Sequence, residues 1–176
     1  TRYALLPFII FSNALNNKYP NKKIFNYRDA ILKKAISTAI QYSNTDGKFF
    51  AFNDAMKDKD YTTSEMIMAV DIYTKAYGLD TAFLPIIKKQ HSLLLTKSGI
   101  QLAEALNTIR NKSFAFPYKT IENTDGAKGN KGGVSILRSG KGTNLTSLIY
   151  KYSSHGLSHG HYDKLNINLF DKGNEI

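Results

Sequence analysis

The sequence predicts an α+β fold in which a run of helices is followed by a run of strands. Over residues 28–43 the apolar side chains recur with the 3.6-residue period of an amphipathic helix. After residue 112 the pattern changes to the two-residue alternation of strands, most clearly in "LNINLF" at 165–170. Because the two element types are segregated along the chain, we expect two layers or domains, 1–112 and 113–176, and not βαβ units.

The individual elements follow from local patterns. A helix over 62–80 has Thr62 and Glu65 spaced as a capping box and Gly78 at its carboxyl end. Shorter helices are predicted over 82–91 and 100–110, and "ALLPFIIF" predicts the buried start of a helix. Strands are expected within 114–123, 132–140, 143–152 and 164–176, with a glycine-rich hairpin loop at 123–133.

Composition narrows the class of protein. The chain has 176 residues, of which 42% are hydrophobic and 22% charged. No apolar run approaches the roughly 20 residues that cross a bilayer, so no membrane span is expected. There is no cysteine, which excludes disulfides and thiolate metal sites.

The chain is strongly basic. Its formal net charge is +10 and its pI is about 9.6, a balance that favours polyanionic partners. The lysines are scattered, however, and form no basic stripe, so we favour a solvated lysine surface over a nucleic-acid-binding face. "GNKGGVS" and "SGKGTN" lack the ending of a phosphate-binding loop and are predicted to be turns.

Three of the four histidines gather within "SSHGLSHGHYDKLNINLF". In a continuous strand, His159, His161 and Asp163 would share a face with Leu165 and Ile167, which we expect to face the core. Two such imidazoles can converge on one metal ion or exchange a proton near neutral pH. The alternative is a structural role at a sheet edge. A bulge at the intervening glycine would also break the shared face. We favour a functional site.

Several stretches resemble one known family. The segments "RYALLPF", "FNDAMKDKDYTTSEM", "GGVSILRSG" and above all "HGHYDKLN" are similar to heparinase II/III-like polysaccharide lyases, most closely to the oligoalginate lyases of polysaccharide lyase family 17. The resemblance implies the last helices of an incomplete (α/α) toroid followed by the first strands of an antiparallel β-sandwich. The active-site cleft would lie between them.

The same resemblance implies roles for individual residues. His159 matches a catalytic histidine that addresses the substrate carboxylate, and Tyr3 matches a substrate-binding tyrosine, although it can equally be an ordinary helix aromatic. His161 matches a ligand of a structural zinc whose remaining ligands would lie beyond Ile176. Asp163 is expected to orient an imidazole. The catalytic tyrosine and an Asn-His pair would precede Thr1. We therefore expect the 176 residues of this chain to be inactive by themselves.

The predicted function is therefore that of a piece of a bacterial lyase, which would cleave uronate-containing oligosaccharides such as alginate by β-elimination from a chain end. The partner would be an acidic polysaccharide or oligosaccharide, with no nucleic acid. Periplasmic or cell-surface location is expected, and homodimer formation is left open. A heparan-type lyase is the nearest alternative, weakened by the few arginines. A non-catalytic carbohydrate-binding or structural protein is another.

Overall fold

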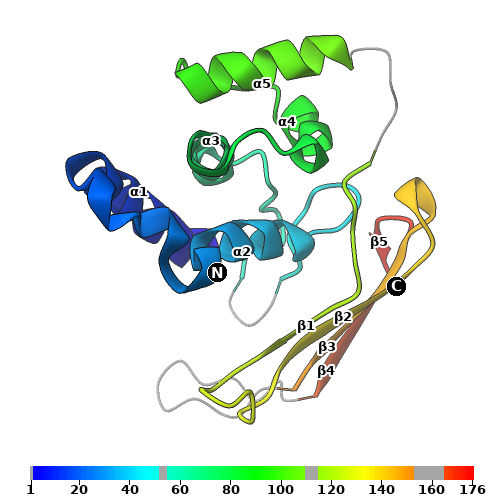
Figure 1. Ribbon diagram of the computed structural model, residues 1–176. Helices are drawn as coiled ribbons and strands as arrows, with labels where there is room; N and C mark the ends of the chain where they lie inside the picture. Colours follow the sequence, from blue (N-terminus) through cyan, green and yellow to red (C-terminus); the bar gives the residue numbers. More distant parts are fainter. Residues whose placement is uncertain (1, 52–54, 110–114, 153–164) are drawn as a thin grey trace. The chain divides into compact units, whose positions relative to one another are not determined.

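The computed structural model describes residues 2–51, 55–109, 115–152 and 165–176 (Figure 1). The chain divides into two parts. The helical unit consists of Thr1–Ile40 and Lys59–Phe116, and the sheet unit of Gln41–Asp58 and Pro117–Ile176. The sheet unit thus includes 41–58, a stretch on the helical side of the boundary expected from the sequence.

Helices build the helical unit, as the 3.6-residue periods predict. Helix α3 packs against α1 and α5, and α4 packs against α5. Short 3₁₀ turns connect several of these helices. The helix bounds are α1 (Arg2–Lys18), α2 (Tyr27–Gln41), α3 (Ser64–Tyr77), α4 (Leu84–Gln90) and α5 (Lys97–Thr108), and the 3₁₀ turns are Pro20–Lys22, Ile24–Asn26 and Thr81–Phe83. No helix among the described residues has the length and apolar character needed to cross a membrane.

The apolar stripe expected on α2 is confirmed only over its second half. Ile36 and Ile40 are fully buried, whereas Ile31 is 46% exposed. The cause lies in the first turn, where residues 28–30 all have positive φ and interrupt the regular right-handed helix. A periodic stripe stays on one face only while the helix is continuous.

Helix α1 also departs from the prediction of a buried start. Ile9 is fully buried, but Phe8 and Phe11 are 65% and 63% exposed. The apolar side chains of α1 therefore lie on more than one face of the helix, and only one of these faces is buried in the helical unit.

The ends of α3 agree with the sequence in one respect and differ in another. The residue before the helix is Thr63, not Thr62, and Thr62 instead donates its amide and hydroxyl to Asp60 Oδ1 at 2.7 and 2.5 Å. The predicted capping box is therefore wrong, since Thr63 occupies the cap position and its side chain makes no capping hydrogen bond. Gly78 follows the helix with φ 86°, which confirms the need for glycine there.

A buried carboxylate connects α3 to the start of α5. Asp71 accepts hydrogen bonds from the hydroxyls of Thr96 at 2.5 Å and Ser98 at 2.8 Å, and Thr96 Oγ1 in turn accepts from the Gly99 amide at 2.9 Å. Asp71 and Ser98 are both buried. The carboxylate therefore positions the N-terminal cap of α5, where a negative charge is also favourable.

Replacing Asp71 with alanine is expected to destabilise the helical unit by about 1–3 kcal/mol, because two hydroxyls lose their acceptor. Hydrogen exchange of the α5 amides in the intact protein measures this effect, with Glu104→Ala, an exposed acid on α5, as the control. Equal protection in the two variants would contradict the assignment.

The sheet unit contains one antiparallel sheet in which the strands follow chain order, β1-β2-β3-β4-β5 (Figure 1). The α+β class is confirmed, and β2 and β3 fall within the regions expected from the sequence. β1 overlaps only the end of the expected region 114–123, and the single strand expected over 164–176 is a hairpin of β4 and β5. The bounds are β1 (Ile121–Thr124), β2 (Gly133–Ser139), β3 (Thr146–Lys151), β4 (Asn166–Asp171) and β5 (Asn174–Glu175).

One face of the sheet is covered by Phe50, which comes from the 41–51 part of the sheet unit. Phe50 packs there with Ile136 of β2 and Ile149 of β3, and Phe170 of β4 lies against this cluster. The rings of Phe50 and Phe170 are tilted, with centroids 5.0 Å apart. The side chains that alternate with Phe170 along β4 therefore point away from this core.

The face predicted for β4 is consequently wrong. Leu165 lies outside the strand with φ 61°, and Leu165 and Ile167 are 69% and 60% exposed. The register pairs Ile149 with Asn168, so the buried face of β4 carries Asn168 and Phe170 instead. The large ring of Phe170 meets Phe50 across a long sequence separation, a contact that alternation alone does not reveal.

Candidate functional site

The residues selected from the sequence are only partly placed. Tyr3 lies in the first turn of α1, and its side chain is outside the described part of the structure, as are His159, His161 and Asp163 entirely. The structure does describe the two strands that flank the histidine segment in sequence: β3 ends at Lys151, and its partner β4 begins at Asn166. Because Leu165 has positive φ, it breaks the extended backbone that the shared-face argument required.

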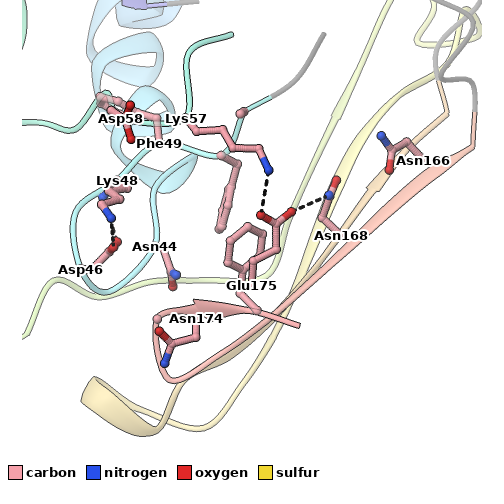
Figure 2. Close-up of a pocket in the computed structure, with 14 residues that line it drawn as sticks. Asn44, Asp46, Lys48, Phe49, Lys57, Asp58, Asn166, Asn168, Asn174 and Glu175 are labelled. Atoms are coloured by element: carbon pink, nitrogen blue, oxygen red, sulfur yellow. Dashed lines mark hydrogen bonds and ion pairs between the residues drawn. The ribbon is translucent and has the colours of Figure 1, made fainter. Parts of the chain in front are cut away.

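The sheet unit contains a pocket of about 510 Å³ (Figure 2). Its walls come from parts of the chain that are far apart in sequence: residues 44–51 and 57–58, and the hairpin of β4 and β5. The lining combines amides, phenyl rings and charged groups. These are Asn44, Asn166, Asn168 and Asn174; Phe49, Phe50 and Phe170; and Asp46, Lys48, Lys57, Asp58 and Glu175, with Ala51 and Gly173.

A tight turn forms the first wall. The Asn44 amide donates to the Lys48 carbonyl at 2.8 Å, and the Gly47 amide donates to the Asn44 carbonyl at 2.9 Å. Asp46 Oδ1 accepts from the Lys48 amide at 2.9 Å, and Gly47 has φ 89°. The sequence "NTDGK" suits such a turn, because Asn and Asp bond to nearby backbone and glycine supplies the positive φ. The turn holds the Asp46 and Lys48 side chains at the pocket.

The second wall is a two-residue hairpin. Lys172 and Gly173 have φ values of 50° and 92°, the pattern of a type I′ turn between antiparallel strands. The turn brings Asn174 opposite Asp171 and Glu175 opposite Phe170. Both Glu175 and Asn168 therefore reach the pocket from neighbouring strands.

Both lysines of the pocket have an acidic partner. Lys57 Nζ lies 3.3 Å from Glu175 Oε2, and Asn168 Nδ2 donates to the other carboxylate oxygen at 3.1 Å (Figure 2). Lys48 Nζ lies 3.7 Å from Asp46 Oδ2. Exposed pairs of this kind add little stability, so their main effect is to orient the polar groups of the lining. With Asp58 included, the described lining has one more acid than base.

Arg138 of β2 anchors the first wall to the sheet. Its guanidinium donates to Gln41 Oε1 at 3.1 Å and to three backbone carbonyls, those of Gln41 at 2.6 Å, Ser43 at 2.9 Å and Lys119 at 2.8 Å. It also lies 4.7 Å from the centroid of the Tyr118 ring. Burial lowers the pKa of Arg138 to about 10, so the group is still a cation at neutral pH.

Tyr118 adds a second connection to the same segment. Its hydroxyl donates to the Asn44 carbonyl at 2.7 Å and shares a 2.9 Å hydrogen bond with the Ser43 hydroxyl. Burial raises the pKa of Tyr118 from 10.0 to about 12. Since folding favours the neutral phenol, this contribution to stability is complete below pH 10.0 and is lost as the pH rises towards about 12.

We therefore expect the Tyr118→Phe variant to lose less stability than the wild type between pH 10.0 and about 12. Thermal unfolding of the intact protein across this range measures the difference. Parallel curves for the two proteins would show that Tyr118 does not titrate between its folded and unfolded states.

The described residues of the pocket are suited to binding a ligand. Amides, paired charges and phenyl rings hold and orient a ligand, and among the lining residues each lysine already faces a carboxylate. Within the described ranges no group of three or more His, Asp or Glu side chains is arranged to hold a metal ion. The described residues thus provide no zinc site, and the predicted ligand His161 lies outside them.

The pocket residues were not anticipated from the sequence. The "NTDGK" stretch carries a local turn signal, but nothing nearby shows that it faces β4 and β5. Lys57 and Glu175, for example, are 118 positions apart. Only the folded sheet unit brings them together.

Comparison with known proteins shows which curated sequences the chain resembles. No family model matches the chain. The chain is 43% identical over 175 residues to an exo-oligoalginate lyase of Saccharophagus degradans and 39% identical over 175 residues to an alginate lyase of Stenotrophomonas maltophilia. The chain is related to alginate lyases. Each alignment covers 99% of this chain but 23% of the relative, so the chain spans about a quarter of the length of these curated relatives.

Proposed function

We propose that the whole protein is a polysaccharide lyase that cleaves alginate by β-elimination. The observation that carries the proposal is the identity of 43% and 39% to two proteins named for this activity, sustained over 99% of the chain. An alignment that spans nearly the whole chain supports a shared architecture and not a borrowed motif.

The substrate determines what such an enzyme has to supply. A uronate residue carries its C5 proton next to a carboxylate, so removing that proton adds negative charge to an existing anion. The enzyme must neutralise or hydrogen-bond the carboxylate, accept the C5 proton and protonate the departing O4. A chain with a formal net charge of +10 suits a polyanionic substrate.

The finer assignments are part of the proposal. His159 would bind the substrate carboxylate as it gains charge, and Tyr3 would contact the sugar chain. Asp163 would orient an imidazole, and His161 would be one ligand of a structural zinc completed by residues outside this chain. The helical and sheet units would belong to a toroid and a sandwich, cleavage would proceed from a chain end, and the protein would act in the periplasm or at the cell surface.

The test is product formation by the intact protein. Incubation with alginate should raise the ultraviolet absorbance of the conjugated C4=C5 double bond, and heparan sulfate should give a much smaller rise. A larger rise with heparan sulfate would favour the glycosaminoglycan lyase. No rise with either polymer would favour a non-catalytic carbohydrate-binding or structural protein.

A further inference from the structure

We propose that the pocket of the sheet unit binds one pyranose ring of a saccharide chain, and that it recognises the ring through hydroxyl groups instead of the carboxylate. The class of ligand, a polysaccharide, rests on the proposed function. The mode of recognition rests on the pocket itself.

The amides of the pocket match the chemistry of sugar hydroxyls. An asparagine side chain offers two N–H donors and a carbonyl acceptor, and a hydroxyl likewise donates and accepts. Asn166 is exposed and lies two residues before Asn168 on β4, so the two amides share the face that also carries Phe170. Glu175, held by Lys57 and Asn168, adds a carboxylate of fixed orientation that can accept from a further hydroxyl. The pocket thus offers both hydrogen-bond donors and hydrogen-bond acceptors to a sugar.

The phenyl rings give the pocket an apolar part. Phe49, Phe50 and Phe170 contribute to the lining, and the Phe50 and Phe170 rings are packed together at 5.0 Å. Phe50 is only 5% exposed, so the half-buried rings of Phe49 and Phe170 are the ones against which the apolar C–H face of a pyranose can pack. The pocket volume of about 510 Å³ falls in the range of roughly 300–1,000 Å³ that is usual for small-molecule sites.

The charges argue against recognition of a carboxylate. Lys57 and Lys48 each face an acid, at 3.3 and 3.7 Å, and Asp58 leaves the described lining with one excess negative charge. An anionic ligand would have to displace Glu175 or Asp46 and would meet the remaining acid. The hydroxyl groups of a sugar can hydrogen-bond to the same side chains without separating either ion pair.

The proposal is tested by affinity electrophoresis of the intact protein in gels that contain either alginate or carboxyl-reduced alginate. The reduced polymer is neutral and lacks the acidic C5 proton, so it is not a substrate for β-elimination. The wild type should be retarded by the neutral polymer, with little dependence on salt. The double variant Asn166→Ala/Asn168→Ala should bind it about tenfold more weakly, because it loses two amide partners on the same face of β4.

Asn144→Ala, an exposed amide of the sheet unit outside the pocket lining, is the matched control and should bind as the wild type does. The single variant Asn166→Ala should give an intermediate loss, which guards against misfolding of the double variant. Absence of retardation by the neutral polymer, equal binding by the double variant and the control, or a loss confined to the acidic polymer would each overturn the proposal.

The ultraviolet assay, run in parallel, separates this proposal from the proposed function. If unsaturated product forms and the pocket variants bind the neutral polymer as the wild type does, the lyase function is supported and the pocket proposal is wrong. If the variants lose binding but no product forms with any of the proteins, the pocket proposal is supported and the lyase function is wrong.

Discussion

Replacing Arg138 with alanine is expected to cause the largest loss of stability in the sheet unit, about 3 kcal/mol or more. The guanidinium donates to Gln41, Ser43 and Lys119 at distances between 2.6 and 3.1 Å. A hydrogen bond from a charged donor contributes about 1.5–3 kcal/mol, and carbonyls left unsatisfied add a desolvation cost. The alanine variant also removes the contact with the Tyr118 ring.

The loss should appear as local opening of the segment that forms the first pocket wall. Hydrogen exchange of the intact protein should show protection over 41–51 reduced by about a hundredfold. Lys141→Ala removes an exposed cation from the same unit and should leave protection unchanged. Equal protection in the Arg138 variant would mean that the segment is held by other contacts.

The largest expected effect on activity comes from His159. In the proposed lyase, its imidazole binds the carboxylate that gains charge when the C5 proton leaves. Removing one such preorganised donor typically lowers kcat by about 10²–10³-fold, so His159→Ala should reduce alginate cleavage by this factor. The initial rate of absorbance increase with the intact protein measures it.

His91→Asn is the matched control for this variant. His91 lies in the helical unit, is exposed and has φ 50°, a backbone conformation that asparagine tolerates. It should retain wild-type activity. If His159→Ala also retains it, the residue does not address the substrate and the assignment of the histidine segment is wrong.

The local elements could be predicted because their signals are local. The period of 28–43 predicted α2, short helices were predicted over 82–91 and 100–110 where α4 and α5 lie, and the change of pattern after residue 112 predicted the sheet. The errors occurred where a neighbour distant in sequence decides the outcome. Phe50 covers one face of the sheet and selects Phe170, so Ile167 is left exposed. Alternation gives two faces but does not say which one is buried.

The candidate pocket shows the same limit. The turn at 44–48 follows from "NTDGK" and the turn at 172–173 from "DKGN", since each sequence supplies the residues that its backbone requires. That the two turns contribute to one pocket depends on Arg138 and on the strand register. These contacts join residues nearly a hundred positions apart, as in the pair of Arg138 and Gln41 with a separation of 97.

Two kinds of recognition would then coexist in the whole protein. The scattered lysines give a positive field that attracts a polyanion at long range and weakens with salt. The pocket, with its paired charges and amides, would act at short range and without regard to the charge of the sugar. Salt should therefore slow the capture of alginate while leaving the binding of a neutral saccharide almost unchanged.

The most direct measurement of the central claim is the mass of the products released from alginate by the intact protein. β-Elimination predicts that each new non-reducing end is an unsaturated uronate, lighter by one water than the product of hydrolysis. Products of the hydrolytic mass, or an intact polymer, would contradict the assignment of this protein as a lyase.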